Sequence, residues 1–253
     1  MDSARSRAES ISVPSRSRAR ITSVDHIRMT TLVLLSGGLD SAVLAAHEAQ
    51  DARVLPVYVS VGLAWEDAEV AMVERLLASP SYAGTVDPLS RVSFTMRDVY
   101  SPTHWAINGV PPAYDTPDED VYLAGRNLVL LTKAGVVASK AKAHRIALGP
   151  LAGNPFPDAR PAFFYAMEQA LSLGLDHRIE VATPFLTWEK EHVIKRGVEL
   201  GVPFEFTLSC MNPVIASGLP RHCGLCSKCR ERRDAFAAAG VSDPSTYASK
   251  SPR

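Results

Sequence analysis

Short apolar runs alternate with longer amphipathic segments along most of this 253-residue chain. The runs are rich in Val, Ile and Leu and lack regular polar alternation, which predicts buried parallel strands. The segments between them carry apolar residues at helical spacing. We therefore expect strands over residues 31–35, 53–59, 92–96, 145–149 and 179–183. We expect helices directly after Asp40 and over residues 65–78, 126–142, 159–173 and 188–200.

This alternation predicts the fold class. Strands that alternate with helices form an α/β protein with a doubly wound, mostly parallel, Rossmann-like sheet, and ligands bind at the carboxyl ends of its strands. The helix expected over residues 126–142 is apolar almost all round, which predicts that it is buried. Residues 100–120 are rich in proline and acidic side chains and predict a long loop. Both a lid over the active site and a plain surface excursion fit this loop.

Composition excludes several classes of function. Hydrophobic residues make up 46% and charged residues 21% of the chain, and the formal net charge is +0. This balance gives no whole-molecule argument for nucleic-acid binding, and no apolar run is long enough to span a membrane. Residues 1–28 are rich in Ser and Arg and predict a disordered basic tail without a secretory signal, solvated rather than bound to RNA. Met29 is a candidate translation start.

The candidate chemistry begins with the stretch Ser36-Gly37-Gly38-Leu39-Asp40-Ser41, between the first strand and the first helix. Because the two glycines lack a Cβ atom, the backbone can take positive φ and approach a ligand closely. The following helix presents unpaired N–H groups and the positive end of its dipole. Together with Leu35, this stretch predicts a phosphate site. Asp40 is a poor phosphate ligand, so we expect it to cap the helix or help hold a metal ion.

Two common phosphate motifs are absent from this stretch. No Lys follows the glycines as in GxxxxGK[ST], and the GxGxxG fingerprint is missing. The pattern SGGxDS instead resembles the pyrophosphate loop, or PP-loop, of the ATP-pyrophosphatases, whose fold is the adenine nucleotide alpha hydrolase-like one. The resemblance implies that the loop holds the β- and γ-phosphates of ATP, that ATP is cut between the α- and β-phosphates, and that a substrate oxygen is adenylylated.

All four cysteines lie in the last quarter of the chain, at Cys210, Cys223, Cys226 and Cys229. Their C-x2-C-x2-C spacing, with a fourth thiol across a Pro- and Gly-containing loop, predicts a tetrahedral structural zinc site. A CxxC redox pair and an iron–sulfur cluster are alternatives that use the same residues. A disulfide framework is disfavoured without a secretion signal. We expect His222 to be a bystander. The predicted organisation is a nucleotide-binding domain over residues 29–205 and a zinc-binding helical segment over residues 206–253.

Taken in order, these motifs resemble the 7-cyano-7-deazaguanine synthase family of queuosine biosynthesis from Met29 to about Ala239. The stretches that carry the resemblance are Ser36–Ser41, Gly125-Arg126-Asn127, Pro157-Asp158-Ala159-Arg160, Thr183-Pro184-Phe185, Ser209-Cys210 and Cys223-Gly224-Leu225-Cys226 with Cys229. Leu63, Trp65 and the stretch Asn154-Pro155-Phe156 differ from the residues that are usual in the family near the expected pocket.

The resemblance implies an ATP-dependent ligase that converts 7-carboxy-7-deazaguanine and ammonia into the 7-nitrile with two ATP, Mg²⁺ and Zn²⁺. It also implies a cytoplasmic homodimer. Asp40, Arg126 and Asp158 are the expected catalytic residues. The expected nucleotide-binding residues are Leu35, Ser36, Gly37, Gly38, Leu39, Asp40, Ser41, Glu69, Asn127 and Arg160.

Two alternative functions remain open at this point. One is a divergent PP-loop amidoligase that adenylylates a different carboxylate. The other is an ATP- or RNA-binding module without turnover. A sulfur-inserting enzyme of the same superfamily usually needs an exposed cysteine pair, whereas the expected metal site occupies all four thiols.

Overall fold

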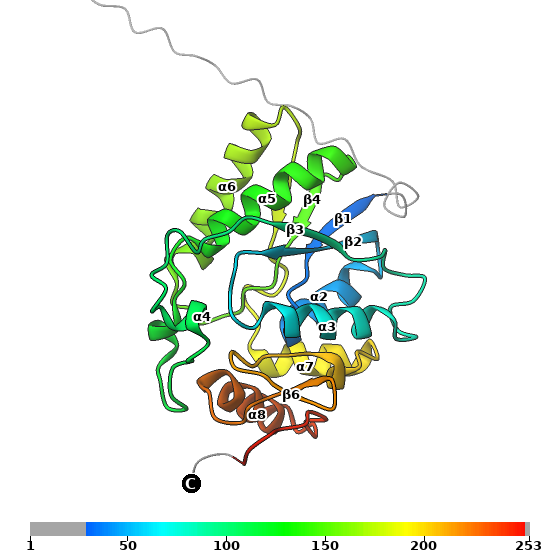
Figure 1. Ribbon diagram of the computed structural model, residues 1–253. Coiled ribbons are helices and arrows are strands. Elements are labelled where there is room, and N and C mark those ends of the chain that lie inside the picture. The colour runs from blue at the N-terminus through cyan, green and yellow to red at the C-terminus, as the bar shows by residue number, and fades with distance from the viewer. Residues whose placement is uncertain (1–28, 251–253) are drawn as a thin grey trace, which may run out of the picture.

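The structure is a computed structural model that describes residues 29–250. The basic tail predicted over residues 1–28 lies outside the described residues. The five strands of the main sheet follow the order β3-β2-β1-β4-β5, and every neighbouring pair is parallel. The predicted doubly wound parallel sheet is therefore confirmed (Figure 1). The strands are β1 (Thr30–Leu34), β2 (Arg53–Ser60), β3 (Ser90–Ser93), β4 (Arg145–Ala147) and β5 (Glu180–Ala182).

Strand β1 lies at the centre of the sheet and separates two hydrophobic cores. Leu32 and Val33 are both fully buried, but they belong to different cores because successive side chains of a strand point to opposite faces. The chain runs outward from β1 to β3 and then returns to β4 on the other side of β1. This reversal creates a topological switch point between β1 and β4, where doubly wound folds bind their ligands.

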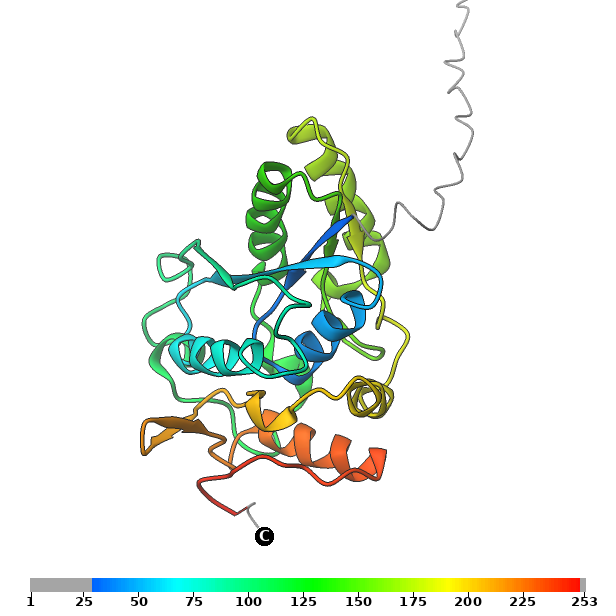
Figure 2. The same cartoon turned by 90° about the vertical axis from the view of Figure 1, so that its right-hand side faces the viewer.

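Helices cover both faces of the sheet. The green α5 and α6 lie on one side, and the blue α2 and cyan α3 on the other, with α7 and α8 beyond them (Figures 1 and 2). Because α7 packs on both α2 and α8, the C-terminal segment is tied to the helix that follows the glycine turn. The helices are α2 (Leu39–Glu48), α3 (Glu66–Leu77), α5 (Arg126–Ala141), α6 (Pro161–Gly174), α7 (Lys190–Glu199) and α8 (Ser227–Ala239).

Two sequence predictions about these elements are wrong. Strand β3 pairs over Ser90–Ser93, earlier than the expected residues 92–96, because its register follows β2. Helix α5 is not buried all round, since Leu128 and Val136 are 47% and 43% exposed. It forms an outer layer, so the sheet covers only the face that carries Leu131, Ala134 and Ala138.

The proline-rich segment over residues 100–120 packs against the rest of the domain. It contains the short helix α4 (Trp105–Asn108) and leads into the 3-10 helix η1 (Asp118–Val121). Ala106 and Val121 are buried in the core on the α5 side of the sheet. The Trp105 ring stacks on Trp65, with 5.7 Å between the ring centroids. The segment is therefore anchored to the domain around Trp105 and Ala106, while residues 108–120 lie exposed or half-buried at the surface, and a lid role stays a prediction.

The C-terminal segment is attached to the nucleotide-binding domain through buried polar contacts. Arg232 of α8 is 1% exposed; it donates a 3.0 Å hydrogen bond to the Phe204 carbonyl and forms a 3.2 Å ion pair with Asp243. The remaining short elements are the 3-10 helices η2 (Pro157–Ala159) and η3 (Phe204–Phe206) and the antiparallel strands β6 (Val214–Ala216) and β7 (Leu219–Arg221). Within residues 29–250, none of the helices has the length and apolar character needed to cross a membrane.

Candidate active site

A cavity of about 550 Å³ lies at the carboxyl ends of β1, β2 and β4. Its lining includes the glycine turn, the start of α5, the residues that follow β4, and side chains of α7 and α8. It therefore sits at the topological switch point of the sheet, where an open parallel sheet is expected to bind its ligand.

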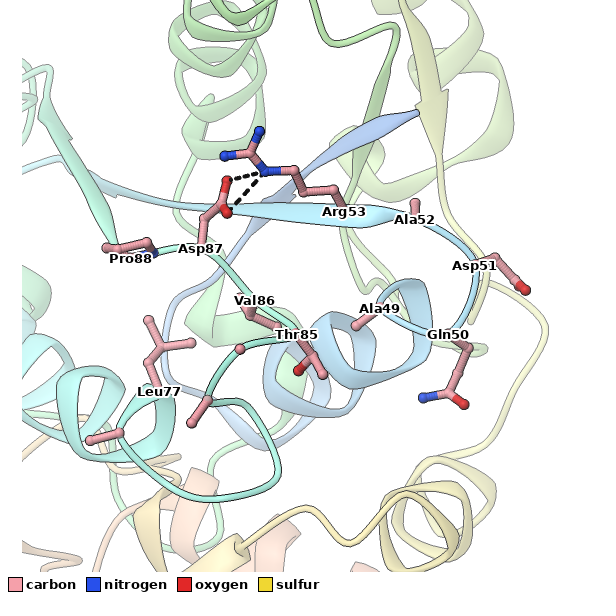
Figure 3. A pocket seen from close by; sticks show the side chains of 13 residues that line it. Ala49, Gln50, Asp51, Ala52, Arg53, Leu77, Thr85, Val86, Asp87 and Pro88 are labelled. Atoms are coloured by element: carbon pink, nitrogen blue, oxygen red, sulfur yellow. Dashed lines mark hydrogen bonds and ion pairs between the residues drawn. The ribbon is translucent and has the colours of Figure 1, made fainter. Parts of the chain in front are cut away.

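A second hollow of about 840 Å³ lies at the opposite edge of the sheet (Figure 3). It faces the amino ends of β2 and β3 and is lined mainly by small residues such as Ala49 and Ala52. Its principal charged feature is an ion pair at the surface, with 3.0 Å between Arg53 Nε and an oxygen of Asp87, in which the Arg53 side chain is 67% exposed. It lacks convergent chemistry, so the smaller cavity is the candidate site.

The glycine turn takes the shape expected of a phosphate loop, with different roles for its two glycines. Gly37 has φ +81, and a Cβ atom there would lie 2.9 Å from Val73 Cγ2. Gly38 has φ −66 and is the N-cap of α2. Of the two glycines that we expected to allow positive φ, only Gly37 therefore adopts it. Ser41 Oγ donates to the Gly38 carbonyl at 3.0 Å and lies 3.3 Å from Ser36 Oγ. These two contacts fix the conformation of the turn at the N-terminus of α2.

Asp40 does not cap α2, because the N-cap is Gly38 and no side chain bonds to the helix end. Its Oδ2 lies 3.4 Å from Lys190 Nζ. Its Oδ1 is buried without a hydrogen-bond partner among the residues that the structure describes. Burial raises the pKa of Asp40, while the nearby Lys190 opposes this rise. The structure therefore contradicts the helix-cap role and shows an ion pair with Lys190, and the metal-ligand role stays a prediction.

Glu69 is a buried carboxylate beside the turn. Tyr58 Oη donates to its Oε2 at 2.7 Å, and Trp65 Nε1 donates to its Oε1 at 3.1 Å. Burial raises the pKa of Glu69 to about 7, although Arg126 and the Tyr58 hydrogen bond lower it. Trp65, which departs from the usual family pattern, therefore supplies a polar donor through its indole N–H. Leu63 instead packs in the apolar core.

Asp158 is held in the cavity by the first turn of α5. The backbone N–H of Asn127 donates to Asp158 Oδ2 at 3.2 Å, and Asn127 Nδ2 donates to the Asp158 carbonyl at 2.9 Å. The Asn127 amide is thus engaged in positioning Asp158. Burial raises the pKa of Asp158, against the opposing effects of the Asn127 hydrogen bond and of Arg126. Tyr122 and Phe156 stack at 4.9 Å in the same cavity lining.

Most of the expected residues line this one cavity, and two do not. The packed position of Gly37 keeps it out of the lining, and Arg160 is exposed at the start of α6. Those in the lining are Leu35, Ser36, Gly38, Leu39, Asp40, Ser41, Glu69, Arg126, Asn127 and Asp158.

An ion network at the cavity was not expected from the sequence. Glu231 Oε1 pairs with Lys190, and Glu231 Oε2 lies 2.7 Å from Lys228 Nζ. Lys228 also lies 3.1 Å from Asp118 in η1. Burial alone would raise the pKa of Glu231, but Lys190 and Lys228 lower it to about 2. Charged residues on helices are usually solvated, so the types of these residues did not predict the network. Their one sequence signal is that they lie close to the motifs along the chain.

The four cysteines converge on one buried point. Their Sγ atoms all lie within 4.8 Å of one another, and none forms a disulfide. Cys210 Sγ accepts the backbone N–H of Cys223 at 3.2 Å, and Cys223 Sγ accepts that of Leu225 at 3.3 Å. Such N–H donors stabilise thiolates, the form that binds metals. His222 is not part of this group; its Nε2 accepts the Ser209 N–H at 3.1 Å.

The parallel sheet, the glycine turn after β1 and the helix N-terminus at the cavity together have the arrangement expected of a PP-loop protein. The model of the family described as queuosine biosynthesis protein QueC matches residues 30–240. The chain belongs to this family. The matched residues include both the glycine turn and the four cysteines.

Three relatives illustrate this membership, and each is called a 7-cyano-7-deazaguanine synthase. The relative from Methanopyrus kandleri is 30% identical, over 86% of this chain and 98% of its own. The relative from Anaeromyxobacter dehalogenans is 33% identical, over 86% of this chain and 95% of its own. The relative from Methanosphaerula palustris is also 33% identical, over 87% of this chain and 99% of its own.

Proposed function

We propose that this chain is an ATP-dependent, AMP-forming ligase that converts 7-carboxy-7-deazaguanine and ammonia into 7-cyano-7-deazaguanine. One observation carries the proposal: a single cavity is lined by the glycine turn and by Arg126, Asp158 and the Tyr122–Phe156 aromatic pair. A nucleotide and a planar, purine-like acid can therefore meet in one site. The names of the relatives support the same product.

The chemistry needs two adenylylations because a carboxylate oxygen is a poor leaving group. In the first, a carboxylate oxygen bonds to the α-phosphorus of ATP, pyrophosphate leaves, and ammonia then displaces AMP with loss of a proton to give the amide. In the second, the amide oxygen bonds to the α-phosphorus of another ATP and pyrophosphate leaves. Departure of AMP with the loss of two N–H protons over this half-reaction leaves the nitrile. The protein's contribution is positioning and charge stabilisation.

The residues have roles that suit these steps. The N–H groups at the start of α2, with Ser36 and Ser41, bind the β- and γ-phosphates. Arg126 pairs with a carboxylate or phosphate, and a guanidinium can do so bidentately. Asp158, held by Asn127, accepts hydrogen bonds from the N–H groups of the guanine-like ring. The proposal includes ammonia as the nitrogen donor, a homodimer and a cytoplasmic location.

Two metals belong to the proposal. The buried Oδ1 of Asp40 lacks a hydrogen-bond partner among the described residues, which suits a carboxylate ligand of the Mg²⁺ that accompanies ATP. Asp40 would hold the ion where its charge offsets that of the phosphates. The four clustered thiols match the ligand set of a structural Zn²⁺ site, which has no open position for chemistry. Zinc would therefore hold the start of α8 in place.

The test is to incubate the protein with ATP, ammonium and 7-carboxy-7-deazaguanine, and to follow AMP release and product mass. We expect two AMP for each nitrile. AMP release only with a different acid would instead identify a PP-loop amidoligase with another substrate. ADP and orthophosphate as products would contradict the proposal, and so would tight ATP or RNA binding without any turnover.

A further inference from the structure

The glycine turn itself contains no lysine, but two lysines from other elements line the same cavity. Lys190 is the first residue of α7, and Lys228 is the second residue of α8. Their side chains are 22% and 28% exposed, so both are partly withdrawn from solvent while they face the cavity. Lys190 Nζ lies 3.4 Å from Oδ2 of Asp40, which belongs to the first turn of α2. A cation therefore stands beside the phosphate loop.

Glu231 is the partner that the two lysines share. Its Oε1 pairs with Lys190 and its Oε2 with Lys228, so one carboxylate holds two ammonium groups. Two neighbouring ammonium groups repel each other, and they stay together only where an anion lies between them or joins them. In the described residues, Glu231 supplies the shared anion from α8, 41 positions along the chain from Lys190, and Asp40 and Asp118 each pair with one of the two lysines.

We propose that Lys190 and Lys228 form a subsite for the pyrophosphate half of ATP, positioned by Glu231. The inference rests on the proposed function, in which ATP releases pyrophosphate. As the substrate oxygen bonds to the α-phosphorus, the bond to the bridging oxygen breaks and its electron pair moves onto pyrophosphate. Ammonium groups beside that oxygen stabilise the developing charge, and their effect is strong where water is excluded.

This inference gives the cysteine cluster a place in nucleotide binding. Cys226 is the N-cap of α8, and Cys229 lies in the first turn of the helix. Lys228 lies between these two residues in sequence, and Glu231 follows Cys229 by two positions. A metal held by the four thiols would therefore fix the turn that carries one lysine of the subsite and the carboxylate that orients the other.

The test compares the affinities for ATP and AMP, because AMP lacks the two phosphates that the subsite binds. We expect Lys190→Met to weaken ATP binding about 10- to 100-fold in calorimetric titrations with Mg²⁺, and to leave AMP binding within about twofold, since a charge-assisted contact contributes about 1.5–3 kcal/mol. Lys228→Met is expected to act in the same direction, and Glu231→Gln more weakly. Lys195→Met is the matched control, because Lys195 lies on the same helix and, among residues 29–250, pairs only with Glu191 at 3.6 Å.

Unchanged ATP affinity in Lys190→Met would overturn the inference. Equal weakening of ATP and AMP binding would also overturn it, because it indicates a general loss of structure. Lys190→Gln guards against misfolding: it keeps hydrogen bonding to Asp40 and Glu231 without the charge, and it must show the same selective loss of ATP. These titrations need no carboxylate substrate, so the subsite and the proposed nitrile synthesis can each fail without the other.

Discussion

The Tyr58 hydroxyl donates a 2.7 Å hydrogen bond to Oε2 of Glu69, which joins the centre of β2 to the first turn of α3 next to the phosphate loop. Glu69 is 7% exposed, and burial raises its pKa from 4.5 to about 7. The folded protein therefore keeps a proton on Glu69 between these two pH values, where the unfolded chain has lost it. Since the folded state then binds more protons, this contribution to stability is present at low pH and is lost as pH rises toward 7.

We expect Glu69→Gln to remove that pH dependence. Between pH 5 and pH 8 the wild-type protein should lose stability relative to this variant by about 2–3 kcal/mol, at 1.36 kcal/mol for each pKa unit. Thermal or urea melts of both proteins at several pH values measure the difference. Glu74→Gln, on an exposed position of the same helix, should follow the wild type. Parallel profiles for Glu69→Gln and the wild type would show that Glu69 titrates as an ordinary carboxylate.

Gly37 and Gly84 separate backbone strain from steric contact, because both have φ +81. Nothing lies within 4 Å of a Cβ built on Gly84, whereas one on Gly37 would approach Val73 at 2.9 Å. Gly84→Ala should cost about 1–2 kcal/mol from the left-handed backbone alone. Gly37→Ala should cost about 1–3 kcal/mol more, because it also forces α3 away from the turn. Urea denaturation measures both, and equal losses would refute the close approach of α3.

Asp158 offers a test of substrate binding that is separate from nucleotide binding. Asp158→Asn keeps an oxygen that can accept the Asn127 N–H but removes the charge that faces the cavity. We expect KM for the carboxylate substrate to rise about 10- to 100-fold, since hydrogen bonds to charged groups contribute about 1.5–3 kcal/mol. ATP affinity should stay within about twofold. Asp176→Asn, at the end of α6 away from the cavity lining, should leave both quantities unchanged. Joint loss of both affinities would argue against the role of Asp158.

The features that the sequence predicts well are local ones. The strand, glycine turn and helix at residues 31–46 follow from short-range periodicity and from glycine stereochemistry, and the structure has all three. The thiols also carry their own signal, because three of them lie within seven positions and the fourth is the only other cysteine. Their convergence within 4.8 Å is confirmed, and the identity of the metal stays a prediction.

Features that depend on tertiary packing escape the same reasoning. Lys190 and Glu231 meet because α7 packs on α8, and no periodicity indicates that two distant charges will pair. The apolar pattern of α5 predicts burial on all sides, but packing covers only one face of the helix. The Asn127 amide contacts Asp158 because η2 packs against α5, a contact absent from either motif taken alone.

The cysteine cluster provides a test that links metal, helix and nucleotide. Cys226→Ser should lose the bound metal and lower the stability by several kcal/mol, because a structural metal site contributes directly to folding. Ser227→Ala is a control inside the same motif: Ser227 Oγ is buried without a hydrogen-bond partner among residues 29–250, so its removal should cost less than about 1 kcal/mol. Cys226→Ser should also bind ATP more weakly than Ser227→Ala, since Lys228 and Glu231 lie on the turn that the thiols hold. Metal analysis, thermal melts and ATP titrations of the purified proteins measure the metal content, the stability and the ATP affinity. A Cys226→Ser protein that retained stoichiometric metal and wild-type ATP affinity would contradict the link.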